Sequence, residues 1–375
     1  MQDNLFDMLK YIIKRILLSV VILLGVSLII YVLVRVKPGD NFIRTKYAMQ
    51  LAQDSTGQVR EMVERMEANY GLDVSPVAGY FHWLGNVVKG DWGESFIFSV
   101  DSGEVERYWI DTSGGSTKYI EFKDDSEVPA GASVVERAVS TSSVFYIIFS
   151  KCGISFIISL IATIFEFVIA IPLGILSARK QYGALDYTVT ILAMMGISLP
   201  TFFLGALMLK VFSIDLGLFP YAGLVNPNSG LPKFLDIAHH LVLPLTTLII
   251  LSIGGLMRYT RTNMLEVMNA DYIRTARAKG LSEHSVIYKH AFRNSLIPIV
   301  TMLAGILPGL FGGAMITETV FSIDGVGKAA LKAVTQGDIP FVMAYNMFLS
   351  LLTVIGTLFS DIMYAVVDPR VKITD

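Results

Sequence analysis

The sequence offers few side chains whose types and spacing could do chemistry. Its one Gly-Lys pair, Gly327–Lys328, lacks a glycine at the upstream spacing of a phosphate-binding P-loop, so nothing predicts ATP binding by this chain. His239 and His240 are adjacent and would point about 100° apart on a helix, which does not suit a shared metal ion. The single cysteine, Cys152, excludes an intrachain disulfide. We therefore expect no catalytic residue, no metal site and no cofactor bound by this chain.

One ionisable residue lies in the middle of a long apolar run. Glu166 interrupts Cys152–Ala178, and an acidic residue at such a position indicates either a polar pathway or a hydrogen bond to a neighbouring helix. Secondary transport is an alternative function, but it usually comes with several such residues and with inverted repeats. No repeated halves are visible here. Glu166 is a candidate intramembrane polar or pathway residue, and both explanations of it stay open.

The most distinctive polar segment is DYIRTARAKGLSEHSVIYKHAFRN, residues 271–294. It predicts two short helices, in which Asp271 can cap the first, Gly280 can take a positive φ and reverse the chain, and Ser282 can cap the second. A helix of about nine residues is marginal in water, so the segment needs a surface beneath it. The residues expected to share one side of the second helix are Val286, Ile287, His290 and Ala291.

Two explanations account for the arginines and lysines of this segment. Basic residues beside a membrane can contact anionic lipid headgroups, which explains the charge alone. A knob that inserts into a groove of a cytosolic partner explains both the charge and the placement of the small residues, and we favour it.

The elements that position this segment are apolar. The chain of 375 residues is 53% hydrophobic and 17% charged, against about 25% charged residues in soluble domains, which indicates lipid as the solvent. Because backbone groups in lipid must be satisfied internally, spanning segments of this kind are expected to be helical. Six segments qualify: Ile16–Val34, Cys152–Ala178, Tyr187–Leu209, Leu241–Met257, Leu296–Thr317 and Phe341–Ser360.

The distribution of lysine and arginine orients these spans. Basic residues are concentrated before the first segment, between the second and third, between the fourth and fifth, and in the tail, which lie on one side if there are six spans. The positive-inside rule then places both termini and residues 258–295 in the cytoplasm, and residues 36–150 outside.

The outer segment is predicted to be partly folded. A helix is expected over Val59–Tyr70, ended by Gly71, and a hairpin on either side of Gly114–Gly115. Ser133–Glu136 has the pattern of a capping box and predicts the start of another helix.

The polar segment resembles the coupling loop of binding-protein-dependent ABC importer permeases, whose core is E-A-A-x-x-x-G. Gly280 matches its glycine and Ala276 its second alanine, whereas Arg274 and Thr275 replace the glutamate and the first alanine. The local form, DYIRTARAKGL with HAFRN, is similar to that of the oligopeptide/dipeptide/nickel branch. KPGD, YGLDVSPVAGYFHWLGNVVKGDWGESF and ETVFSIDGVG, starting at Lys37, Tyr70 and Glu318, resemble further blocks of its B-type permease.

This resemblance implies an all-α polytopic membrane protein with six transmembrane helices of the type I ABC importer kind. Its parts would be residues 1–35, the cytoplasmic N-terminus and first helix, residues 36–150, a large extracytoplasmic loop containing some β structure, and residues 151–375, a five-helix domain. Residues of about 98–131 look like an insertion. The ATPase-coupling residues implied are Asp271, Tyr272, Arg274, Thr275, Ala276, Arg277, Ala278, Lys279, Gly280, Leu281, His290, Arg293 and Asn294.

The resemblance also implies the partners. They are a second, C-type permease, two cytosolic subunits that bind ATP and Mg, and an external solute-binding protein, with membrane lipid around the complex and no nucleic acid. The chain would be a translocation subunit for peptides in a bacterial or archaeal inner membrane. A permease for nickel or another metal complex, of the same branch, and a secondary transporter subunit are the alternatives.

Small residues in the fifth segment predict close helix packing. Gly305, Gly309 and Gly313 are four residues apart, so on one continuous helix they would share a face and allow close backbone approach. The sequence leaves open whether that face meets the sister permease or another helix of this chain.

Overall fold

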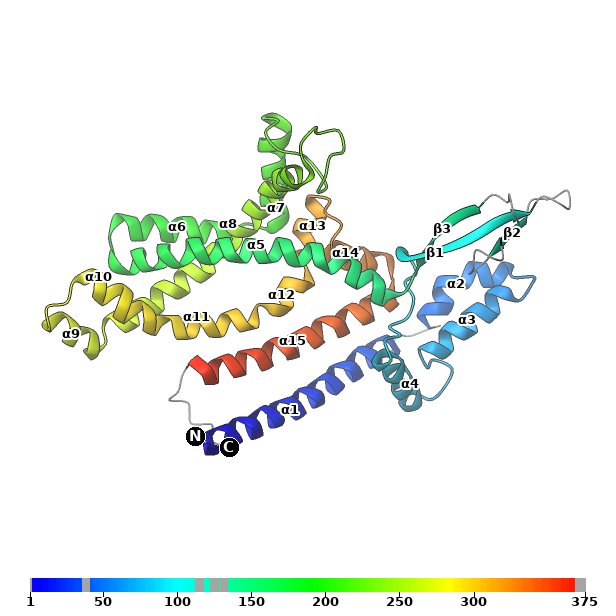
Figure 1. Cartoon of the computed structure of the whole chain (residues 1–375), viewed down its shortest axis with the longest axis horizontal. Helices are drawn as coiled ribbons and strands as arrows, with labels where there is room; N and C mark the ends of the chain where they lie inside the picture. The colour runs from blue at the N-terminus through cyan, green and yellow to red at the C-terminus, as the bar shows by residue number, and fades with distance from the viewer. Residues whose placement is uncertain (1, 36–40, 112–117, 122–127, 129–133, 368–375) are drawn as a thin grey trace. The chain divides into compact units, whose positions relative to one another are not determined.

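The computed structural model describes residues 2–35, 41–111, 118–121, 128 and 134–367 (Figure 1). The chain forms two compact units. The first comprises Met1–Ile29, Lys151–Lys332 and Asn346–Asp375, and the second comprises Ile30–Ser150 and Ala333–Tyr345.

Helices account for most of the described residues. Those before the sheet are α1 (Gln2–Arg35), α2 (Phe42–Gln53), α3 (Gln58–Asn69) and α4 (Pro76–Val88). The strands are β1 (Val100–Asp111), β2 (Lys118–Glu121) and β3 (Val134–Thr141). The elements that follow are α5 (Val144–Arg179), α6 (Ala184–Ser198), α7 (Thr201–Met208), the π-helix η2 (Leu209–Asp215), α8 (Lys233–Met268), α9 (Asp271–Ala278), α10 (Glu283–Ser285), the π-helix η3 (Val286–Phe292), α11 (Arg293–Gly305), α12 (Leu307–Gly312), α13 (Met315–Val320), α14 (Val326–Gln336) and α15 (Ile339–Val367).

Four helices in the described part of the chain are long and apolar enough to cross a membrane, and a fifth is added if one bent pair counts as a span. These four coincide with the first, second, fourth and sixth of the expected segments. They are Ile13–Arg35, Val144–Arg179, Lys233–Met268 and Ile339–Ser360.

The third expected segment is bent. Instead of one helix over Tyr187–Leu209, α6 and the α7–η2 pair meet at 101°. Proline disfavours the helical conformation of the residue before it, and Leu199, which precedes Pro200, has an extended backbone with φ −81° and ψ 131°. The helix therefore ends at Ser198.

The fifth expected segment is broken as well, so the prediction of one continuous helix over Leu296–Thr317 was wrong. Pro298 lies inside α11, Pro308 lies in the first turn of the short helix α12, and Gly313 follows that helix with a φ of +76°. A positive φ ends a helix, because right-handed helical backbone needs negative φ. Apolar composition alone did not reveal these breaks.

Two strands of the sheet, β1 and β2, lie within the segment of about 98–131 that was expected to be an insertion, and β3 follows it. β1 is the central strand and pairs antiparallel with β2 and β3 (Figure 1). In this register Trp109 lies opposite both Ile120 and Val134. The predicted turn at Gly114–Gly115 is outside the described residues. The helix predicted to start at Ser133–Glu136 was wrong, because Val134 begins β3, whose backbone groups pair with β1.

The second unit has an aromatic core. Tyr31, Phe42, Tyr70, Tyr80 and Trp83 are buried there, with Ile43, Val63 and Met343. The helix predicted over Val59–Tyr70 is confirmed as α3, and Gly71 follows it with a φ of +61°. The Gly71 carbonyl accepts hydrogen bonds from the Tyr31 hydroxyl at 3.2 Å and from the Arg35 guanidinium at 2.6 Å. These bonds join the end of α1 to the turn after α3.

The first unit contains a buried carboxylate that organises the chain after α12. Glu318 is 1% exposed and accepts hydrogen bonds from the Ser155 hydroxyl at 2.8 Å and from the backbone N–H groups of Ala314 at 3.0 Å and Lys328 at 2.8 Å. All three partners are donors, which suits an ionised carboxylate. Through these bonds Glu318 links α5 to both ends of the loop around α13.

Glycines let the backbone close around this carboxylate. A Cβ at Gly325 would lie 2.5 Å from both Glu318 Oε2 and Ser155 Oγ, and a Cβ at Gly327 would lie 2.9 Å from Glu318 Oε2. The glycines of the ETVFSIDGVG block therefore have a steric role.

We predict that Gly325→Ala destabilises the first unit by about 1–3 kcal/mol, because the added methyl group overpacks the Glu318 carboxylate. Thermal unfolding of the purified chain in detergent would measure the effect. Gly255→Ala is the matched control, since a Cβ there would meet nothing within 4 Å. Equal unfolding midpoints for Gly325→Ala and the wild-type chain would contradict this role of the carboxylate.

Candidate functional site

The polar segment after α8 folds as a compact hairpin of short helices, at the same end of the first unit as the turn between α5 and α6 (Figure 1). α9 begins after Ala270, which occupies the N-cap position without a side-chain hydrogen bond. The prediction that Asp271 caps α9 was therefore wrong. Asp271 is the first helical residue, where a carboxylate still favours the positive end of the helix dipole.

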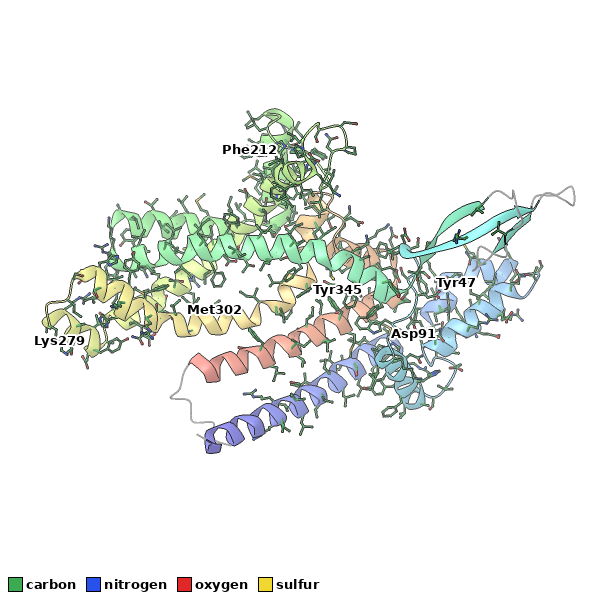
Figure 2. All side chains as sticks on the ribbon, in the orientation of Figure 1. Tyr47, Asp91, Phe212, Lys279, Met302 and Tyr345 are labelled. Carbon is green, nitrogen blue, oxygen red and sulfur yellow. The ribbon has the colours of Figure 1, made fainter. Side chains whose placement is uncertain are left out.

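The turn after α9 has the predicted geometry. Gly280 has a φ of +76°, and its backbone N–H donates to the carbonyl of Arg277 at 2.9 Å. Ser282 caps the following turn, because its hydroxyl accepts from the Ser285 N–H at 3.3 Å. Lys279, next to Gly280, is labelled in Figure 2 at the tip of this hairpin. Glycine is favoured at such a turn, since a side chain strains left-handed backbone.

An ion pair spans the same turn. Arg277 donates to Glu283 through Nη2 at 2.9 Å and through Nε at 3.3 Å. The hydrogen bond from Arg277 lowers the pKa of the Glu283 carboxyl from its ordinary value. Both side chains are partly exposed, so the pair adds orientation more than stability.

The second helix of the hairpin differs from the short α-helix that the sequence predicted. Only three residues, Glu283–Ser285, form α10, and the chain then widens into η3 and continues as α11. Val286, Ile287 and Ala291 are buried on one side as expected, whereas His290 is half-buried. The hairpin is thus continuous with a longer helix and is not a free-standing loop.

An apolar contact holds α9 in place. Ile273 is fully buried and Ala276 is 7% exposed, and both belong to a cluster formed with α5, α8 and η3. We call this whole cluster the hairpin seat. Its other members are Ile175, Ala178, Met264, Val286, Ile287 and Ala291. Because α9 has only eight residues, this burial supplies the stability that the isolated helix lacks.

The outer face of the hairpin is polar and mostly basic. Its exposed residues include most of those predicted to contact a partner. They are Asp271, Tyr272, Arg274, Thr275, Arg277, Ala278, Lys279, Gly280, Leu281, Arg293 and Asn294. Two predicted residues are exceptions. Ala276 belongs to the hairpin seat and supports the surface from below, and His290 is half-buried.

A buried ion pair near the hairpin was not predicted. Asp186 of α6 is 3% exposed. It accepts hydrogen bonds from Arg261 of α8, from Nε at 2.7 Å and from Nη2 at 2.8 Å. It also accepts from the Ser177 hydroxyl and, at 3.0 Å, from the Tyr182 N–H. The pair joins α5, α6 and α8 just before α8 reaches α9. No spacing pattern reveals a contact between residues 75 positions apart.

The remaining candidates lie apart from the hairpin. Glu166 is half-buried on α5. A Cβ at Gly305 or Gly309 would meet nothing within 4 Å, whereas one at Gly313 would lie 2.6 Å from Glu318 Oε1. Since α11 ends at Gly305 and α12 at Gly312, the three glycines do not line one continuous helix. Gly313 serves the fold of its own chain.

The long apolar helices define an integral membrane protein. Among the described residues, no group of three or more His, Cys, Asp or Glu side chains could hold a metal ion. Comparison with known families adds a more specific result. The model of the binding-protein-dependent transport system inner membrane component matches residues 170–373, more than half of the chain. A second model, of the N-terminal part of such membrane components, matches residues 8–96.

The chain therefore belongs to the family of binding-protein-dependent transport system inner membrane components. It is 34% identical to the oligopeptide transport system permease protein AppB of Bacillus subtilis, over 97% of this chain and 100% of that protein. It is 29% identical to the dipeptide transport system permease protein DppB of the same organism, over 98% of this chain and 99% of that protein. Among solved structures, a chain of the inward-facing MetNI methionine ABC transporter aligns with a TM-score of 0.47 and 17% identity, covering 60% of this chain and 97% of that chain.

We predict that Ile273→Ala loosens α9 locally, because it leaves a cavity in the hairpin seat. Such a substitution lowers the free energy of local unfolding by about 2–5 kcal/mol. Backbone amides of α9 should then exchange hydrogen roughly thirtyfold faster or more, at tenfold per 1.4 kcal/mol. Tyr272→Ala removes a large side chain from the neighbouring position, which is 47% exposed, and should leave exchange unchanged. Equal protection in Ile273→Ala and Tyr272→Ala would show that α9 does not depend on the seat.

Proposed function

We propose that this chain is a B-type permease subunit of an ATP-driven importer of peptides. The observation that carries the proposal is the similarity to an oligopeptide permease and a dipeptide permease over nearly the whole length of all three chains. In this proposal the chain forms the translocation pathway together with a second, C-type permease. Two cytosolic subunits bind and hydrolyse ATP, and an external solute-binding protein delivers the peptide.

The α9–η3 hairpin is proposed as the element that receives the motion of the ATP-binding subunits. Its exposed polar face would lie in a groove of one of these subunits, and the hairpin seat would pass displacement to α5 and α8. The buried Asp186–Arg261 pair would then move α6 together with α8. Packed side chains suit this task, since protein interiors are dense and transmit strain. The energy source lies outside this chain, in agreement with its lack of a P-loop.

The proposed topology has six spans, with the α6–α7–η2 bend as the third and the broken α11–α12 segment as the fifth. Both termini and the hairpin would be cytoplasmic, and residues 36–150 would face outward. Gly305 and Gly309 are proposed to contact the sister permease, because a Cβ at either position would meet nothing described within 4 Å in this chain. Glu166 is proposed as a polar residue of the pathway.

The coupling role predicts the effect of Gly280→Val. A β-branched residue resists the φ of +76°, at a cost of about 1–2 kcal/mol, and redirects Arg277 and Lys279. The variant should insert into the membrane normally but lose both peptide uptake and peptide-stimulated ATP hydrolysis in the reconstituted complex.

Gly217→Val is the matched control, since Gly217 also has a positive φ, of +62°, with nothing within 4 Å of a Cβ. It lies in the loop after η2, far along the chain from the hairpin, and should keep uptake. If the segment only contacted lipid headgroups, both valine variants would transport alike, and wild-type uptake by Gly280→Val would remove the coupling role.

The topology predicts opposite labelling of two exposed positions. In a Cys152→Ser background, Ser55→Cys should react with an impermeant thiol reagent in cells whose outer barrier is opened. Lys180→Cys, in the turn between α5 and α6, should react only after the membrane is permeabilised. Labelling of Lys180→Cys in sealed cells would overturn the six-span arrangement.

A further inference from the structure

The bent third segment has an apolar surface that the proposed function does not use. α7 packs against α8 and α13, and a Cβ at Gly205 would lie 3.1 Å from Val320 Cγ1. Other side chains of α7–η2 and of the loop after it are large, apolar and between 43% and 59% exposed. We call them the outer apolar face, and they are Phe202, Phe203, Leu207, Ile214, Leu216 and Leu218.

The bend sets the direction of this face. α6 and the α7–η2 pair meet at 101°, and α7 stands away from the α5–α6–α8 bundle (Figure 1). An upright α6 therefore puts α7–η2 close to the membrane plane. α6 has 15 residues, so it is about 22 Å long and ends about 8 Å inside a hydrocarbon core of about 30 Å. Helices that lie in the membrane interface are buried to a similar depth, about 5–10 Å.

The charges of this region suit a lipid environment. Leu216–Pro232 contains no charged residue. The only two charged residues of α7–η2, Lys210 and Asp215, pair with each other, so neither is left uncompensated near acyl chains. Lys233 is exposed at the start of α8, where its alkyl stem can lie along acyl chains while its ammonium group reaches the headgroups. Tyr221 is 59% exposed, and tyrosine is enriched at membrane–water interfaces.

The loop after η2 is fixed to the start of a membrane helix. His239 of α8 donates through Nε2 to the Leu218 carbonyl at 2.9 Å, and the Asn226 N–H donates to the buried Asp236 carboxylate at 2.6 Å. Between these two residues Phe234 precedes them on α8 with 79% exposure. The exposed apolar side chains of the loop therefore adjoin the apolar start of α8, and this continuity favours lipid over a partner protein as the molecule that covers them.

We propose that α7–η2 lies in the membrane plane, at the outer boundary between acyl chains and headgroups. The outer apolar face contacts acyl chains of outer-leaflet phospholipids, and Lys233 reaches their phosphates. The inference rests on the proposed six-span topology for the choice of leaflet, and it goes beyond peptide import because it assigns lipid as the partner of this surface. A helix placed in this way anchors the outer end of α6, since α6 cannot slide along the membrane normal without carrying α7–η2 out of the interface.

The depth of three spin labels tests this arrangement. Phe203→Cys, Leu207→Cys and Ile214→Cys, each in a Cys152→Ser background, would carry nitroxides in the full-length chain, purified with its partner subunits and reconstituted in phospholipid liposomes. Collisions with oxygen, which concentrates in lipid, and with a water-soluble nickel complex give the depth of each label. The three depths should be similar, because a helix in the membrane plane has no rise along the normal. A helix that crossed the membrane would separate Phe203 and Ile214 by about 15 Å, and such a spread would overturn the proposal.

The same collisions identify what covers the face. Labels at Leu207→Cys and Leu218→Cys should collide with oxygen in preference to the nickel complex. Asn228→Cys is the matched control, because Asn228 is an exposed polar residue of the same loop, and its label should show the reverse preference. A preference for nickel at Leu207→Cys and Leu218→Cys would place the face in water, and shielding from both reagents would show that a protein covers it. Either result would overturn the proposal.

The outcomes also separate this inference from the proposed function. Peptide uptake by a complex whose three labels spread in depth would overturn the in-plane helix and leave peptide import standing. Similar depths in lipid, in a complex that takes up no peptide, would support the in-plane helix and count against peptide import.

Discussion

Burial of Ile273 and Ala276 in the hairpin seat is the contact on which the candidate site depends. A helix of eight residues does not hold its shape in water, and the Gly280 turn fixes direction but adds little stability. The seat joins α9 to α5, α8 and η3 through side chains alone. With α9 anchored from below, its charged side chains present a fixed surface, and any force on that surface reaches the long apolar helices directly.

Two buried carboxylates also stabilise the first unit, because each accepts hydrogen bonds from several elements. Asp186 receives a guanidinium, a hydroxyl and a backbone N–H, and Glu318 receives a hydroxyl and two backbone N–H groups. Breaking such an arrangement leaves a buried charge uncompensated, which is strongly destabilising. Each carboxylate therefore fixes the geometry of one connection through directional hydrogen bonds, which apolar packing does not provide. Asp186 does so at the α5–α6 turn, and Glu318 does so in the segment after α12.

Tyr70 in the second unit shows the opposite condition. Tyr70 is 5% exposed, and its hydroxyl has no hydrogen-bond partner among the described residues. The two carboxylates stabilise the fold because their partners satisfy them, whereas a buried hydroxyl without a partner costs free energy.

The sequence by itself determined the apolar segments, the α3 helix, the positive φ of Gly280 and the cap at Ser282, because each depends on residues close together in the chain. The breaks at Pro200 and Gly313 also depend on local residues, but a hydropathy average over a long segment does not detect single prolines and glycines. Only the tertiary structure decided the Asp186–Arg261 pair, the hydrogen bonds to Glu318, and the formation of a strand at Val134–Glu136, where the sequence predicted a helix. Each depends on partners far apart in the sequence, and no local pattern carries the information on which of them will meet.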